Sequence, residues 1–203
     1  MTYHLGEAMR TLAANLFLCG LLFTPRPAVA QWGLSGEIGV ARFGGTSRDT
    51  SEARVAPYRP TTFAMRLDRA LGSTRVELAV QYAKTGFAGE RDNIAIVQYD
   101  VGSFWELAPD ASVRLARFGA GVDARLEAGP VVDLWKVEGD TRTRVGGRAA
   151  AALEWPIARA FTGSLRVSGA LTGSVFDAAE VPDGVERVAT RRVAVAIGLR
   201  YGL

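Results

Sequence analysis

Side chains capable of covalent or metal chemistry are scarce in this sequence. Its one cysteine, Cys19, and its one histidine, His4, both fall within the first 30 of 203 residues. The rest of the chain cannot form an internal disulfide, and it has no histidine to activate a nucleophilic serine. Carboxylates such as Asp123 and Asp140, without cysteine or histidine nearby, are weak metal ligand candidates. No GxxxxGK[ST] phosphate loop is present. We therefore expect no catalytic residue, no cofactor and no metal, and we predict that the protein is not an enzyme.

Long apolar runs are missing after Phe23. A transmembrane helix needs about 20 mostly apolar residues, so any membrane insertion by the rest of the chain must use a closed β-barrel. An excess of one charge is missing as well. Without Glu7, Arg10 and Arg26, the chain has 22 basic and 20 acidic residues, a net charge of +2 (22 − 20). This balance does not predict a nucleic-acid partner.

The first 30 residues have the pattern of a secretory signal. Arg10 supplies a positive charge, an apolar run extends from Leu12 to Phe23, and Ala28-Val-Ala30 provides small residues before a cleavage point. The run is too short to span about 30 Å of hydrocarbon. We expect residues 1–30 to be a cleaved signal peptide, and residues 31–203 to form one domain.

Alternation of apolar and polar residues predicts eight strands in that domain. They are Trp32–Phe43, about Thr61–Leu71, Arg75–Tyr82, about Asn93–Leu107, a strand from Ala111 onward, Arg142–Trp155, Phe161–Ser174 and Arg191–Leu203. Short turns are expected at 71–73, 108–110 and 156–160. Longer connections are expected at 44–59, 86–92 and 175–188, and the segment 129–140, with Trp135, is expected to extend beyond the membrane. Short turns at one end and long connections at the other are typical of outer-membrane barrels.

Aromatic residues gather at the end of the predicted strands that holds the short turns. A membrane barrel carries an aromatic girdle at each interface with water. We expect one girdle to consist of Trp32, Trp105, Trp155, Phe161 and Tyr201.

The last strand is apolar on one face and small or cationic on the other. Its apolar parity includes Val195, Ile197, Leu199, Tyr201 and Leu203. It resembles the C-terminal targeting strand of bacterial outer-membrane barrels, with Leu203 in place of the usual Phe or Trp. The whole predicted domain resembles the eight-stranded OmpX and OmpA-transmembrane-domain family of Gram-negative bacteria. The resemblance implies an all-β, eight-stranded antiparallel up-and-down transmembrane barrel in the outer membrane. It also implies contact with outer-membrane lipid and assembly by the barrel-assembly machinery through this strand.

Charged residues are expected on the inward parity of the strands. Eight strands enclose a lumen just wide enough to be filled by side chains, where buried charges must pair. We predict a structural network made of Glu37, Arg66, Asp68, Arg75, Glu77, Asp100, Arg114, Arg144, Arg148, Glu154, Arg166, Arg192 and Arg200. An alternative is a narrow, porin-like channel that prefers anions, because eight arginines in this set face five carboxylates.

These patterns favour a non-enzymatic outer-membrane protein with a structural or surface-interaction role and a lumen plugged by side chains. Besides the narrow channel for small solutes, a secreted lipocalin-like carrier of a small ligand is an alternative from another class. The polar segments at 47–54 and 177–186 are candidates for binding an unidentified surface partner.

Overall fold

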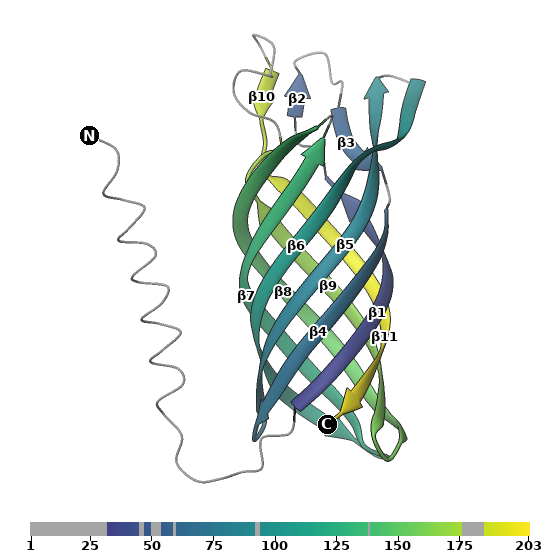
Figure 1. Cartoon of the computed structure of the whole chain (residues 1–203), viewed down its shortest axis with the longest axis vertical. Helices are drawn as coiled ribbons and strands as arrows, with labels where there is room; N and C mark the ends of the chain where they lie inside the picture. The colour runs from purple at the N-terminus through teal and green to yellow at the C-terminus, as the bar shows by residue number, and fades with distance from the viewer. Residues whose placement is uncertain are drawn as a thin grey trace, which may run out of the picture. The chain divides into compact units, whose positions relative to one another are not determined.

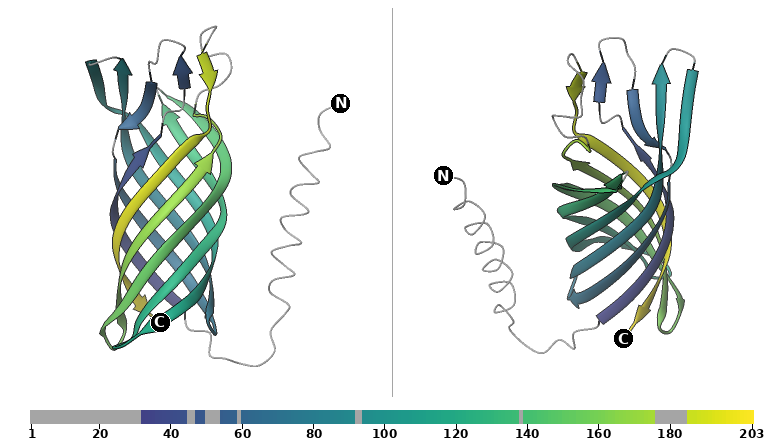
Figure 2. Two further views of the ribbon diagram at one scale, coloured as in Figure 1. Left: turned by 180° about the vertical axis from the view of Figure 1, so that it is seen from behind. Right: turned by 45° about the horizontal axis from the view of Figure 1, so that its top comes forward.

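The computed structural model describes residues 32–44, 47–49, 54–58, 60–91, 94–137, 139–175 and 185–203. The predicted signal peptide lies outside these ranges. Eight of the strands in the described ranges close into an antiparallel barrel (Figures 1 and 2). They are β1 (Trp32–Phe43), β4 (Thr61–Leu71), β5 (Thr74–Arg91), β6 (Ile94–Phe118), β7 (Val122–Val137), β8 (Asp140–Ala158), β9 (Phe161–Thr172) and β11 (Thr190–Gly202). The predicted fold class is confirmed.

Closure follows from the pairing of the first and last barrel strands. β1 pairs with β4 on one edge and with β11 on the other, and β5 pairs with β6. The barrel strands therefore have no free edge over the closed part, which satisfies their backbone hydrogen bonds without water. No helix in the described ranges is long and apolar enough to cross a membrane.

Side chains alternate between the inside and the outside of this barrel. On β1 the buried positions include Ser35 and Glu37, whereas their neighbours Leu34 and Ile38 are 42% and 47% exposed. The same alternation holds on β4, where Arg66 is buried and Met65 is exposed. These inward residues of β1 and β4 are the ones that the alternation in the sequence predicts.

The predicted turn at Ala108–Asp110 is wrong, because β6 continues through it to Phe118. Proline commonly marks turns, but here the pairing with β5 runs without a break from Thr74↔Val113 to Thr85↔Gly102. On the other side, the register of β6 and β7 places Pro109 opposite Pro130. Neither proline has a backbone N–H to leave unpaired, so the strand tolerates both. The turn instead lies at residues 119–121.

The predicted loop at 86–92 is wrong, because β5 extends to Arg91 and β6 begins at Ile94. The segment 129–140 continues a strand, as the sequence predicts: β7 extends to Val137, and β8 begins at Asp140. Short strands continue the sheet beyond β5 in the order β10 (Val185–Arg187), β2 (Ser47–Asp49), β3 (Arg54–Tyr58) and β5. They stand at the end opposite the C-terminus (Figure 1).

Candidate functional site in the barrel interior

Glu37 is at the centre of the charge network inside the barrel. One carboxylate oxygen, Oε2, lies 3.0 Å from Nε of Arg66 on β4. The other, Oε1, lies 3.0 Å from Nε of Arg166 on β9. All three side chains are buried. Gly198 on β11 lies directly beside Glu37, and a Cβ at that position would come within 2.7 Å of Glu37 Cγ. The absence of a side chain at Gly198 therefore leaves the space that Glu37 occupies.

Arg66 also lies close to three further carboxylates. Its Nη1 is 3.7 Å from Glu77, 3.8 Å from Asp110 and 4.0 Å from Glu127. Arg166 forms a second ion pair with Glu127. Buried charges are tolerated only when they are paired in this way, because their desolvation is costly. The middle of the barrel interior thus holds a connected set of ion pairs.

The network continues toward the end of the barrel that carries the short strands. Arg148 lies 3.3 Å from both Glu106 and Asp110. Arg192 pairs with Glu106 and lies 3.7 Å from Asp133. These side chains are buried as well, so the ion pairs extend through much of the interior.

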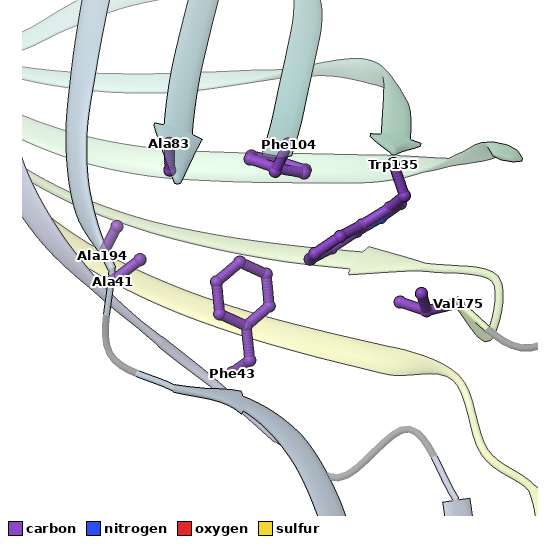
Figure 3. Close-up of a cluster of buried hydrophobic side chains, with 7 residues drawn as sticks. All are labelled: Ala41, Phe43, Ala83, Phe104, Trp135, Val175 and Ala194. Carbon is purple, nitrogen blue, oxygen red and sulfur yellow. The ribbon is translucent and has the colours of Figure 1, made fainter. Parts of the chain in front are cut away.

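An aromatic cap covers the network at that end. It consists of Phe43, Phe104 and Trp135, which converge from β1, β6 and β7 (Figure 3). Phe104 and Trp135 are 4.7 Å apart between ring centroids, and Phe43 lies 5.4 Å from Trp135. The Arg192 guanidinium is 4.7 Å from the Phe104 centroid, within cation–π range. Val175 packs against the same cluster.

Trp135 therefore corrects one expectation from the sequence. It is fully buried inside the barrel and does not lie on the outside beyond the membrane. The reason is that β7 begins at Val122, which sets the inward parity that Asp133 and Trp135 share. The outward positions Val122, Ala124 and Leu126 place Trp135 inward as well, because β7 pairs with β8 without a break from Asp123 to Val137.

At the opposite end the interior is held by separate ion pairs. Arg200 binds Asp68 through two hydrogen bonds of 2.7 Å, and Arg75 donates to Glu154 at 2.7 Å. The Arg200 guanidinium passes over Gly33 of β1, where a Cβ would lie 2.2 Å from Nη2. Glycine at this position is what lets a side chain of β11 reach β4 across the intervening strand.

The structure places most of the predicted network residues inside the barrel, with differences at the ends. Arg114 is exposed near the end of β6 and lies 3.6 Å from Asp123. Arg144 is half-buried and donates to the carbonyl oxygens of Ser174 and Val175. The side chain of Asp100 lies outside the described residues. The residues that the structure brings together inside are Glu37, Arg66, Asp68, Arg75, Glu77, Arg148, Glu154, Arg166, Arg192 and Arg200.

Sequence analysis missed six inward charged residues that are buried, all on β6 and β7. They are Glu106, Asp110, Asp123, Arg125, Glu127 and Asp133. Their alternation is visible in the sequence once β6 is read through Pro109 and β7 is started at Val122. The missed set contains five carboxylates and one arginine, so the excess of arginine over carboxylate seen in the predicted network disappears.

The predicted aromatic girdle is divided between the two ends of the barrel. Trp32, Trp155, Phe161 and Tyr201 lie at the end that holds the short turns, and they are 37–43% exposed on the outer face. Phe161 and Tyr201 are 5.2 Å apart between centroids. Trp105 was wrongly assigned to this end. Because β6 continues to Phe118, Trp105 pairs instead with Tyr82, near the other end.

The described residues contain no group of three or more His, Cys, Asp or Glu side chains arranged to hold a metal ion. The carboxylates that were weighed as metal ligands have other surroundings. Asp123 accepts hydrogen bonds of 2.7 and 2.9 Å from Arg117, and Asp140 is exposed at the start of β8. Asp123 is therefore bound by an arginine side chain in this structure.

Comparison with known proteins gives structural likeness only. No protein-family model and no curated protein matches the chain. Among solved structures, Neisserial surface protein A (NspA) superimposes with a TM-score of 0.56 at 8% identity, over 84% of this chain and 96% of that one. The outer membrane protein OprG from Pseudomonas aeruginosa superimposes with a TM-score of 0.55 at 8% identity, over 86% and 96% of the two chains. The chain thus has the eight-stranded barrel fold of these outer-membrane proteins, as expected for the OmpX and OmpA type.

Proposed function

We propose that the protein is an integral outer-membrane β-barrel whose lumen is closed by side chains, with a structural or surface-interaction role and no enzymatic activity. The observation that carries this proposal is the polarity of the barrel wall. Its interior holds a connected network of buried ion pairs, and its outer face exposes large apolar side chains on every barrel strand. Such a wall suits a hydrocarbon solvent outside and a polar lumen inside.

The same polarity argues against a secreted small-ligand carrier. A soluble barrel buries apolar side chains and exposes polar ones to water. Here Leu34, Met65, Val167 and Ile197 are 42–62% exposed, whereas Arg66 and Glu37 are buried. In water the outer face would be an exposed apolar surface far larger than soluble monomers carry. A bilayer provides the surroundings that this face requires.

The interior also favours the proposal of a closed lumen rather than that of a narrow channel. Arg66, Arg166 and Glu37 meet across the middle of the barrel, and the aromatic cap lies over them at one end. The arginine excess that favoured an anion channel is gone once the carboxylates of β6 and β7 are included. Ion pairs that bridge β1, β4 and β9 are suited to holding the wall together.

The strands that rise beyond the barrel are the part best suited to surface interactions. β10, β2 and β3 extend the sheet from the upper part of β5, at the end that an outer-membrane barrel directs outside the cell. Loops and short strands carried on a rigid scaffold commonly bind partners. Assembly through β11 by the barrel-assembly machinery stays a prediction of the same proposal.

Fractionation of cells that express the full chain tests the proposed location. The protein should be recovered from the outer membrane, and unheated samples should migrate differently from boiled ones because a folded barrel resists detergent. Mass spectrometry of that material should show Gln31 as the first residue. Recovery in a soluble fraction, or an outer-membrane form that retains Met1, would contradict the proposal.

Planar-bilayer recording of the purified, folded protein tests the closed lumen. We expect no steady single-channel current, because the ion pairs and the aromatic cap fill the space that eight strands enclose. A general porin reconstituted in parallel shows that channels are detectable under the same conditions. Stable, anion-selective currents from this protein would make the channel the better interpretation.

A further inference from the structure

The charged side chains that the structure describes on the outer face of the barrel are of one sign. In the ranges that the structure describes, the outward charged side chains of the barrel strands are Arg42, Arg69, Lys84, Lys136 and Arg191. Among the aspartates and glutamates of these strands, those whose side chains the structure describes lie on the inward parity. Four of the five cations, all except Arg69, lie near the end of the barrel that carries β2, β3 and β10. Among the described side chains, the outward charges near this rim are all cations, and an apolar wall with such cations is complementary to anions.

Two of these cations lie on one row of neighbouring strands. Lys84 on β5 pairs with Ser103 on β6, Ser103 pairs with Lys136 on β7, and Lys136 pairs with Thr141 on β8. All four residues are on the outward parity, and Lys84, Lys136 and Thr141 are exposed. The row therefore presents two ammonium groups that alternate with two hydroxyl groups. Ammonium and hydroxyl groups both donate hydrogen bonds to phosphate oxygens.

An aromatic row lies directly below this cationic row. Phe63 pairs with Tyr82, and Tyr82 pairs with Trp105, two residues closer to the short-turn end than Lys84 and Ser103. The Tyr82 and Trp105 rings are 4.7 Å apart between centroids. Tyrosine and tryptophan on a membrane barrel mark the boundary between acyl chains and headgroups. Lys84 and Lys136 therefore lie at the height of lipid headgroups.

We propose that Lys84, Ser103, Lys136 and Thr141 form a binding surface for the phosphate groups of an anionic lipid in the external leaflet. This proposal rests on the proposed outer-membrane function, because it needs the apolar wall to be inserted. A lipid fits this surface better than a soluble anion does. Its acyl chains would cover Tyr82, Trp105 and the apolar residues below them while its phosphates meet the lysines.

Native mass spectrometry of the folded full chain in dodecyl maltoside can test this proposal, because that detergent has no phosphate. The probes are diphosphoryl lipid A and the same lipid after removal of its phosphates. The wild type should bind the phosphorylated lipid more tightly. The K84Q/K136Q variant should lose on the order of twentyfold in affinity for it, since each cation beside an anionic lipid surface contributes a factor of roughly five. K84R/K136R should restore binding.

Two control variants locate the effect. Arg159→Gln removes an exposed cation from the turn at the opposite end and should leave affinity within about twofold of wild type. R42Q/R191Q removes a cationic pair at the same rim, on β1 and β11, and should cost less than K84Q/K136Q. Equal binding of both lipids, unchanged binding by K84Q/K136Q, or a larger loss in R42Q/R191Q would overturn the assignment. The assignment would also be overturned if millimolar inorganic phosphate displaced bound lipid A as effectively as added unbound lipid A does, because the surface would then bind a soluble anion.

Failure here is distinguishable from failure of the proposed function. If the wild type folds with heat-modifiable mobility and fractionates with the outer membrane but does not distinguish the two lipids, only the lipid site is wrong. If it never inserts, the barrel proposal itself is wrong.

Discussion

Replacing Glu37 by alanine should destabilise the folded barrel by about 3–5 kcal/mol, the usual cost of removing one member of a buried ion pair. Glu37 is the shared partner of Arg66 and Arg166, each at 3.0 Å, and its side chain is 2% exposed. Its loss leaves two buried guanidinium groups without that carboxylate. Reversible folding titrations in urea with lipid vesicles would measure the change in the free energy of unfolding.

The Arg117–Asp123 pair, in which the arginine is exposed, provides the control. Arg117 donates hydrogen bonds of 2.7 and 2.9 Å to Asp123, but its side chain is 58% exposed. Arg117→Ala should therefore cost about 1 kcal/mol, because the removed charge is exposed and Arg114, 3.6 Å from Asp123, still pairs with that carboxylate. If Glu37→Ala were as mild as this control, the interior would be hydrated and the closed lumen would be wrong. No new conductance is expected in Glu37→Ala, because the aromatic cap is intact.

The barrel itself was predictable because a closed sheet in lipid imposes a simple rule on the sequence. Strands such as β1 and β11 must present apolar residues to one side at every second position. That pattern survives in Leu34, Ile38 and Val40 and in Val195 and Ile197. The number of strands and the identity of their inward residues can be read from this alternation wherever the turns are placed correctly.

The errors arose where a local signal disagreed with the sheet. Pro109 follows Ala108 and precedes Asp110, a combination that favours a turn. The neighbouring strand overrides this preference, since β5 pairs with β6 on both sides of the proline. With the turn misplaced, Asp110 was lost from the predicted interior, and Trp105 was assigned to the wrong end.

The partners of the inward charges could not be predicted from parity alone. Parity places Glu37, Arg66 and Arg166 inside, but which side chains meet depends on strand tilt and stagger around the barrel. The roles of Gly33 and Gly198 were hidden for the same reason. Glycines in strands suggest close packing in general, and only the structure shows that Arg200 and Glu37 occupy those spaces.

Replacing Val195 by arginine should cost about 2–4 kcal/mol, the penalty for a cation on the lipid face near the bilayer midplane. Val195 is 43% exposed near the middle of β11, and its cross-strand neighbours are Val40 and Val167. No polar side chain on these pairs can shield the new charge. Folding titrations in vesicles measure the loss, and Val195→Leu, which keeps the face apolar, should be nearly neutral. Arginine at inward Ser168, paired with Ala150 and Ala194, should be milder than at Val195, and the reverse order would show that the lipid-facing and inward parities have been exchanged.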